Sequence, residues 1–335
     1  MKQFINFIKR RLEYVFYAGF GLVIIACILA VFWPKHQAEQ FNTFVPPEKS
    51  IVTTFKDGIT FELVKVYGLT KIKRPVSVFV DSKRLYISDS ASNKVIILNR
   101  NGGTFAVISK AGSAKNSEID YPYGIVPFSN DKILLADTGG QKIFVYKRDS
   151  AFVRQLEIKG GTIQKPGYML ASASKIYIAD LAGHDIKIMN KDGNIIGSIG
   201  TPLNGNLLLR YPQGMALDNS GNLWVADGGN QRIVCFNKTG QYIKSFNGSE
   251  NGGNSFAMVK GLAILSNKYL CISDPMSSII RVFDLSDKLK EIGNVGGTGV
   301  EPGKFMHPMG LYVDELNHLF VADRGNSRVQ EFTIR

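Results

Sequence analysis

Cysteine and histidine are both scarce in this chain, with three of the first and four of the second among 335 residues. No CxxC spacing occurs, so neither a disulfide framework nor a cysteine-bound structural zinc is expected. Four scattered histidines do not supply the three convergent ligands that a catalytic zinc usually requires. The cysteines are Cys27, Cys235 and Cys271, and the histidines are His36, His184, His307 and His318.

Short motifs of the common enzyme classes are missing as well. The chain has no P-loop, no dinucleotide-binding fingerprint and no Gly-x-Ser-x-Gly nucleophile motif. We therefore expect no cofactor, no bound metal and no catalytic residues, and binding is favoured over catalysis.

Glycine and positive charge, by contrast, are plentiful. The 34 glycines favour a fold with many tight turns, and they show no collagen-like period. The 40 Lys and Arg against 28 Asp and Glu give a net charge of +12, which suggests anionic partners or a membrane surface. Residues 1–35 account for +4 of this charge (five basic residues and one acidic), and the remaining +8 lies beyond them.

One long apolar run lies near the N-terminus, over residues 14–33, and contains no formal charge. Twenty residues form a helix of about 30 Å, enough to cross a bilayer. The basic cluster at 9–11 precedes the run, so the positive-inside rule predicts a single-pass signal anchor in the plasma or inner membrane. Residues 1–13 would then be cytoplasmic, 34–50 a linker, and 51–335 a periplasmic or extracellular domain.

Two other interpretations of this segment stay open. A cleaved signal peptide would have a shorter apolar stretch and a small-residue cleavage site, which is not found here. A lipoprotein signal is suggested by residues 24–27, which end in Cys27, but the chain continues apolar to Trp33 instead of turning polar.

The strongest pattern is a six-fold repeat of the form apolar-x-apolar-small-Asp, spaced by 48, 43, 47, 47 and 49 residues. A period of this length is typical of propellers or solenoids. Each copy contains four short runs of β-branched and aromatic residues separated by Gly, Asn and Asp, which predicts four strands. The sequence thus indicates an all-β, six-bladed propeller. The repeat aspartates are Asp89, Asp137, Asp180, Asp227, Asp274 and Asp323.

The last copy ends at Arg335 on its third strand and so lacks a fourth. Residues 59–67 form a strand-like run with no blade of their own. We predict that this run completes the last blade and closes the ring, which removes the open sheet edges.

The residues around the aspartates resemble the NHL repeat. The resemblance lies in residues 227–233 and 323–329 and in the Pro-x-Gly starts at 122–124, 212–214 and 308–310. It implies a six-bladed NHL propeller over about residues 59–335. The third and fifth copies depart from the pattern, because Asp185 and Ile279 replace the basic residue found five positions after the aspartate elsewhere.

We interpret the six aspartates as structural, because a turn-capping role is needed in every blade whereas a site needs asymmetry. Propellers usually bind ligands on the face where the second-to-third and fourth-to-first strand loops emerge. The residues expected to ring the channel mouth on that face are Arg74, Tyr121, Lys165, Tyr211, Met258 and His307. Just inside them we expect Tyr123, Gln213, Lys260 and Met309.

The function that these observations favour is a membrane-anchored, extracytoplasmic scaffold or sensor that binds a protein or peptide. One alternative is a metal-dependent hydrolase or lyase with its site in the channel, since some six-bladed relatives are zinc lyases. A second alternative is single-stranded RNA binding, for which basic and aromatic side chains are suited. Nucleic acid is the less expected partner because the predicted topology places the domain outside the cytoplasm.

Overall fold

The computed structural model describes residues 51–335, apart from 57, 69, 114–116, 201–207, 251–252 and 287. The predicted membrane span at 14–33 and the linker at 34–50 lie outside the described residues. In the described part, no helix has the length and apolar character needed to cross a membrane.

Six antiparallel sheets, the blades, make up the described chain. Blade one comprises β3 (Pro75–Val80), β4 (Arg84–Asp89), β5 (Lys94–Asn99) and β6 (Thr104–Ile108). Blade two comprises β7 (Pro122–Pro127), β8 (Lys132–Asp137), β9 (Lys142–Lys147) and β10 (Phe152–Gln155). Blade three comprises β11 (Pro166–Ala171), β12 (Lys175–Asp180), β13 (Asp185–Asn190) and β14 (Ile195–Ile199). Blade four comprises β15 (Pro212–Leu217), β16 (Leu223–Asp227), β17 (Arg232–Phe236) and β18 (Tyr242–Phe246). Blade five comprises β19 (Leu262–Leu265), β20 (Tyr269–Asp274), β21 (Ile279–Asp284) and β22 (Lys290–Gly296). Blade six comprises β23 (Pro308–Val313), β24 (Leu319–Asp323) and β25 (Arg328–Ile334), together with β2 (Thr60–Tyr67) and β1 (Val52–Thr54).

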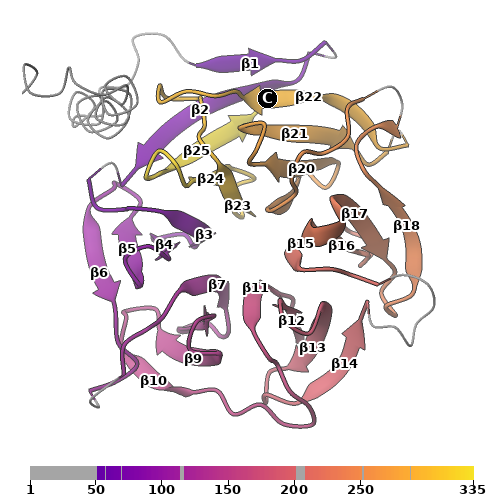
Figure 1. The fold of residues 1–335 in the computed structure, drawn as a ribbon. Helices are drawn as coiled ribbons and strands as arrows, with labels where there is room; N and C mark the ends of the chain where they lie inside the picture. Colours follow the sequence, from indigo (N-terminus) through magenta and orange to yellow (C-terminus); the bar gives the residue numbers. More distant parts are fainter. Residues whose placement is uncertain are drawn as a thin grey trace, which may run out of the picture. The chain divides into compact units, whose positions relative to one another are not determined.

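The blades are arranged around one axis, with the first strand of each blade innermost (Figure 1). The predicted all-β six-bladed propeller is therefore confirmed. Inner strands of neighbouring blades approach closely: a Cβ on Gly214 would lie 2.5 Å from the carbonyl oxygen of Lys260. Glycine at this position is what allows blades four and five to meet at the axis.

Burial explains the strand patterns within a blade. Second strands such as β8 are buried on both faces because they are covered by the adjacent blades, and they are almost continuously apolar. Fourth strands such as β18 are largely exposed. Side-chain exposure thus rises from the inner strands to the outer strand of each blade. This is the reason that the apolar runs in the sequence differ so much from one strand to the next.

The core is a set of clusters between adjacent blades. Between blades four and five, Trp224, Phe246 and Phe283 pack together, with the two phenylalanine rings 5.2 Å apart. Each such side chain stabilises the fold by roughly 1.5–3 kcal/mol when it is fully buried. Cys235 and Cys271 are buried here as well, and burial raises the pKa of both thiols to about 12, which keeps them protonated at neutral pH.

The ring is closed by strands from both ends of the described chain. The strand expected at residues 59–67 is β2, which pairs antiparallel with β25 in a register that places Leu63 opposite Phe332. A further short strand, β1, which the sequence pattern did not indicate, adds to the outer edge of β2 and places Thr54 opposite Thr60. Blade six thus has five strands where the others have four.

Candidate functional site

The end of the propeller that carries the second-to-third strand turns is called the top face below, and the other end the bottom face. Every repeat aspartate lies buried at the end of a second strand, next to the top face. In each blade it accepts a backbone N–H from the segment that leads into the first strand. These aspartates therefore tie two loops of the same blade together.

The aspartates form this tie in two alternating ways. In blades one, three and five the carboxylate accepts two successive amides, as Asp89 does from Lys73 and Arg74. In blades two, four and six it accepts only one, as Asp227 does from Arg210. The ring therefore has two types of blade in alternation.

A glycine two residues after the aspartate accompanies the single-amide type. In blade four Gly229 donates its N–H to the carbonyl of Arg210 over 2.7 Å, and a Cβ there would lie 2.8 Å from that oxygen. The equivalents in blades two and six are Gly139 and Gly325, whereas blades one and three carry Ala91 and Ala182. This difference was present in the sequence but was not used in its interpretation.

The residues expected to ring the channel mouth follow the same alternation. Tyr121, Tyr211 and His307 have a positive φ of 47–52°, whereas Arg74, Lys165 and Met258 do not. Tyr121 and Tyr211 are 39% and 50% exposed, and Arg74 and Lys165 are also exposed. A left-handed backbone is uncommon for residues other than glycine. These three residues therefore hold a strained backbone conformation on the top face, and the surrounding contacts must stabilise it.

The preceding blade supports the exposed tyrosines. The N–H of Tyr121 donates to the side chain of Asn93, and that of Tyr211 donates to Nδ1 of His184 over 3.1 Å. The His184 ring also meets the Tyr211 ring edge to face at 4.4 Å. Each tyrosine is thus fixed by a turn of its neighbour.

The inner residues named from the sequence are mostly buried and form a floor. Tyr123 donates its hydroxyl to the side-chain oxygen of Gln213 over 3.0 Å, so a bond joins blade two to blade four across the axis. Met309 is 9% exposed beside them. Lys260 is half-buried, and its backbone carbonyl accepts the N–H of Gly214.

Tyr168 completes this floor and was missed by the sequence analysis. It occupies the position at which four other blades have glycine, and its hydroxyl donates across the axis to the carbonyl of Val76 over 2.9 Å. Its ring meets that of Tyr123 edge to face at 4.9 Å. The only sequence signal was the departure from Pro-x-Gly in residues 166–168. Tyr123 and Tyr168 thus lie in contact across the channel near its top end, and together they are called the tyrosine plug below.

Below the plug, the channel is a cavity of about 250 Å³ lined by the inner strands of all six blades. Its walls are mainly aliphatic, as at Val78, Val126 and Leu262. No described histidine lies among the residues that line it.

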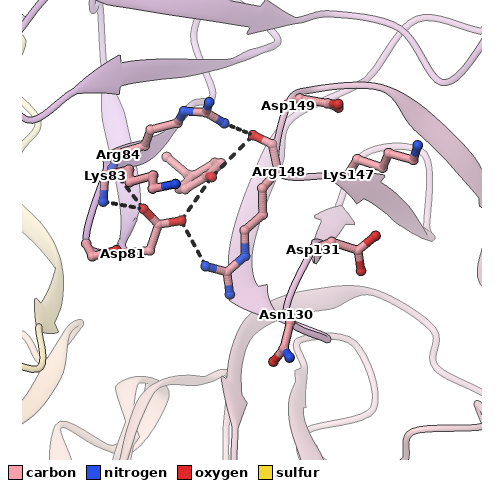
Figure 2. Close-up of a pocket in the computed structure, with 10 residues that line it drawn as sticks. Asp81, Lys83, Arg84, Asn130, Asp131, Lys147, Arg148 and Asp149 are labelled. Carbon is pink, nitrogen blue, oxygen red and sulfur yellow. Dashed lines mark hydrogen bonds and ion pairs between the residues drawn. The ribbon is translucent and has the colours of Figure 1, made fainter.

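A second cavity, of about 550 Å³, lies on the bottom face between blades one and two (Figure 2). An ion pair of 2.9 Å joins Asp81 of blade one to Arg148 of blade two. Arg84 donates a hydrogen bond to the backbone carbonyl of Arg148. The Tyr86 hydroxyl lies within hydrogen-bond distance of the Asp81 carboxylate and of the same carbonyl. Since Asp81, Arg84, Tyr86 and Arg148 bond mainly to one another across the two blades, this arrangement is that of a junction between blades.

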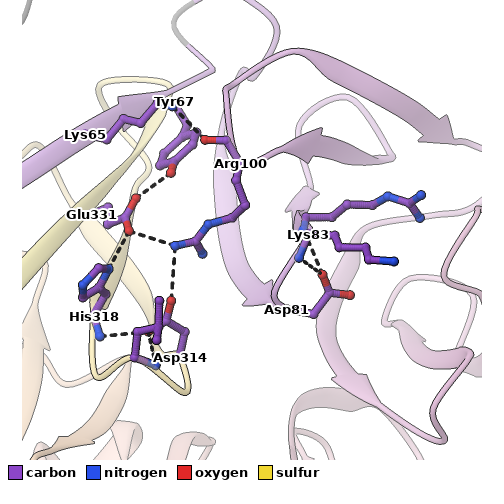
Figure 3. A network of polar contacts seen from close by, with 10 residues as sticks. Lys65, Tyr67, Asp81, Lys83, Arg100, Asp314, His318 and Glu331 are labelled. Carbon is purple, nitrogen blue, oxygen red and sulfur yellow. Dashed lines mark hydrogen bonds and ion pairs between the residues drawn. The ribbon is translucent and has the colours of Figure 1, made fainter.

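The junction between blades six and one contains a similar network (Figure 3). Glu331 accepts hydrogen bonds from Tyr67 over 2.5 Å and from Arg100 over 3.0 Å, and it lies 2.8 Å from Nδ1 of His318. Asp314, His318 and Glu331 are close enough together to hold a cation. However, one nitrogen of Arg100 pairs with both carboxylates, so a guanidinium already supplies the positive charge there.

Comparison with known proteins supports the fold and the repeat. The model of the NHL repeat matches residues 209–236 and 305–332, which belong to blades four and six. These are the blades in which the aspartate pairs with an arginine five residues on, at 2.8 Å in both cases. Among curated proteins, none matches this chain in sequence.

Several solved structures are similar in fold at low identity. A streptogramin B lyase is 15% identical, with a TM-score of 0.57, covering 88% of this chain and 96% of its own. A catalytically inactive virginiamycin B lyase from Staphylococcus aureus, with quinupristin, is 14% identical, with a TM-score of 0.56 and coverage of 86% and 97%. A gluconolactonase from Xanthomonas campestris is 13% identical, with a TM-score of 0.61 and coverage of 87% and 96%. Identities this low show the fold alone. The chain is a six-bladed β-propeller with NHL repeats in its fourth and sixth blades.

Proposed function

We propose that the propeller is a binding module that holds an extended protein segment against its top face. The observation that supports this most is the alternation of exposed tyrosines with exposed cations around the mouth, in the order Arg74, Tyr121, Lys165 and Tyr211. Tyrosine provides a large, rigid contact surface at low entropic cost, and it is enriched in protein interfaces.

The plugged axis favours binding over catalysis in the channel. A substrate that entered from the top face would meet Tyr123 and Tyr168, which are both buried and bonded across the ring. His184 and His307 come from blades three and six, and His318 belongs to the bottom face, so these three do not converge on one ion. The similar lyases and gluconolactonase share the propeller, and a propeller can serve many functions.

We further propose that residues 14–33 anchor the module in a membrane with the propeller outside the cytoplasm. This part of the proposal is supported by the uncharged apolar run and the basic residues before it. Protease protection in intact cells tests it. Degradation of the propeller by externally added protease is expected, and full protection that lasts until the cells are lysed would contradict it.

Crosslinking in intact membranes tests the binding face. We expect a stoichiometric protein partner to be recovered with the wild-type chain and lost with the double variant Tyr121→Ala, Tyr211→Ala. The matched control is Tyr242→Ala, because Tyr242 is 48% exposed on the outer strand of blade four. Equal recovery by the double variant and the control, or recovery of no partner at all, would contradict the proposed function.

A further inference from the structure

The histidine in the second-to-third strand turn of blade three, His184, accepts a hydrogen bond on the top face. The backbone N–H of Tyr211 donates to its Nδ1 over 3.1 Å. A ring nitrogen of histidine accepts a hydrogen bond only while it carries no proton, so this bond selects the neutral ring with its proton on Nε2. Protonation of Nδ1 would set two N–H groups against each other and break the bond.

Tyr211 is a residue for which the loss of this bond matters. Its φ of 47° lies in the left-handed region, so the surrounding contacts must stabilise its backbone. His184 supplies two of these contacts, namely the acceptor for the N–H and a ring that meets the tyrosine ring edge to face at 4.4 Å. The carbonyl of Tyr211 accepts the side-chain amide of Gln213 over 3.2 Å. Without the imidazole, Tyr211 would stay tied on its carbonyl side and lose its tie on the amide side.

The equivalent turn of blade one performs the same task with a residue that does not titrate. Asn93 and His184 both lie four residues after a repeat aspartate, and both are left-handed, with φ of 53° and 58°. The side-chain oxygen of Asn93 accepts the N–H of Tyr121 over 3.0 Å. A carboxamide oxygen accepts at any pH, whereas histidine ordinarily changes its charge between about pH 5 and pH 8. Of two equivalent tyrosines, one is thus held by an acceptor that can respond to pH.

The charged groups on the elements that pack against His184 are of types that do not ordinarily titrate in this range. They are Asp180 and Asp185 in its own turn, Lys165 in the loop whose carbonyl bonds that turn, Arg210 next to Tyr211, and Asp227 and Arg232 in blade four. Asp185 is paired with Lys187, and Asp227 with Arg232. Carboxylates, lysines and arginines ordinarily keep their charge between about pH 5 and pH 8. A transition of Tyr211 in that range therefore reports on the imidazole.

We propose that His184 is a pH-sensitive positioning residue of the top face. Its neutral ring holds Tyr211 in place, and its protonation releases the tyrosine. The consequence for binding rests on the proposed function. Since protonation and binding are linked through Tyr211, a partner that needs this tyrosine is held at neutral pH and binds more weakly as the pH falls.

Amide hydrogen exchange in the full chain tests the positioning without any partner. After correction for the intrinsic pH dependence of exchange, the Tyr211 amide should exchange about three- to tenfold faster at pH 5 than at pH 7.5, as expected for the loss of one neutral hydrogen bond. The amide of Gly214 is the internal control. It donates to the carbonyl of Lys260 over 2.7 Å, so its protection should be the same at both pH values.

Two variants separate a pH-dependent role from a merely structural one. His184→Asn copies the arrangement of blade one, so it should keep the Tyr211 amide protected at both pH values and abolish the difference. His184→Ala removes the acceptor and should give fast exchange at both. A wild-type protein without a pH difference at Tyr211, or a difference that persists in His184→Asn, would overturn the proposal.

Crosslinking at the same two pH values separates this inference from the binding face. The wild-type chain should recover less of its membrane partner at pH 5 than at pH 7.5, and His184→Asn should recover equal amounts. If exchange at Tyr211 does not respond to pH while the tyrosine double variant loses the partner, the positioning role is wrong and the face stands. If Tyr211 is released at pH 5 while the double variant keeps its partner, the positioning role stands and the proposed face is wrong.

Discussion

At the scale of single residues, equivalent aspartates have different electrostatic surroundings. Asp227 and Asp323 each have an arginine at 2.8 Å. In blade two the corresponding cation is Lys142, which is exposed, and the carboxylate of Asp120 is a neighbour. Burial, with the charge of Asp120 adding to it, raises the pKa of Asp137 to about 6.

This shift predicts a pH dependence of stability. The folded-state pKa of Asp137 lies above its unfolded value of 3.8, so its protonated form favours folding. That contribution is complete below the unfolded pKa and is lost as the pH rises through about 6. Relative to Asp137→Asn, the wild-type free energy of unfolding should fall by up to about 3 kcal/mol from pH 4 to pH 7. Urea denaturation across this range measures it, and parallel pH profiles for the two proteins would refute it.

A second residue-scale prediction concerns the glycine of the single-amide turn. Gly229→Ala should destabilise the protein by about 1–3 kcal/mol, because the new methyl group meets the backbone of Arg210. Blade three already has alanine at this place, so Ala182→Gly should change stability by less than about 1 kcal/mol. Thermal and urea denaturation of both variants compare them. A Gly229→Ala protein as stable as wild type would show that the turn can relax.

At the scale of elements, the contacts between β2 and β25 depend on one buried carboxylate. Glu331 is 3% exposed and joins Tyr67, Arg100 and His318. Burial, together with the hydrogen bond to Glu331, raises the pKa of Tyr67, so its hydroxyl remains a donor. The last blade is thereby tied both to the first blade and to the closing strand.

Neutralising that carboxylate should weaken the closure. Glu331→Gln leaves Arg100 with Asp314 as its single anionic partner and is expected to cost about 3 kcal/mol of unfolding free energy. Glu62→Gln is the control, because Glu62 pairs at the same seam with the exposed Arg335 and should cost less than about 1 kcal/mol. The two variants are compared by urea denaturation. A similar small loss for both would mean that the buried network adds little to closure.

Apart from β1, the strands were predictable from sequence because they carry apolar runs bounded by turn residues, and the repeat aspartates mark the end of each second strand. The two blade types were not recognised, since the difference depends on one glycine per turn and on a positive φ at residues such as Tyr211. Of the candidate site, the exposed ring was anticipated. Tyr168 was not, because only the three-dimensional arrangement shows which side chains reach the axis.

At the scale of the whole molecule, the closed ring depends on a strand far from its partner in sequence. β2 and β25 are paired across more than 260 residues, and blade six has no fourth strand without β2. A chain that lacked β2 would expose the edge of β25 to other molecules.

Deletion of residues 1–68 should therefore prevent a stable monomer from forming. We expect aggregation or domain exchange in size-exclusion chromatography, together with loss of a cooperative thermal transition. Deletion of residues 1–54 removes β1 but keeps β2 and Phe55, and it should leave a folded monomer. A monomeric, cooperative protein from the longer deletion would contradict the role assigned to β2.

The alternation of blade types has a consequence for how such a ring is inherited and engineered. Each blade has the same type of turn as the next blade but one, and a different type from its immediate neighbours. The natural unit of duplication is then a pair of blades, and the ring consists of three copies of that pair. A turn transferred from one blade to the equivalent place in another should then be tolerated better when the two blades are of the same type than when they are neighbours. A designer who idealises this ring should optimise an odd and an even blade together and repeat the pair, because a single consensus blade would average two incompatible turns.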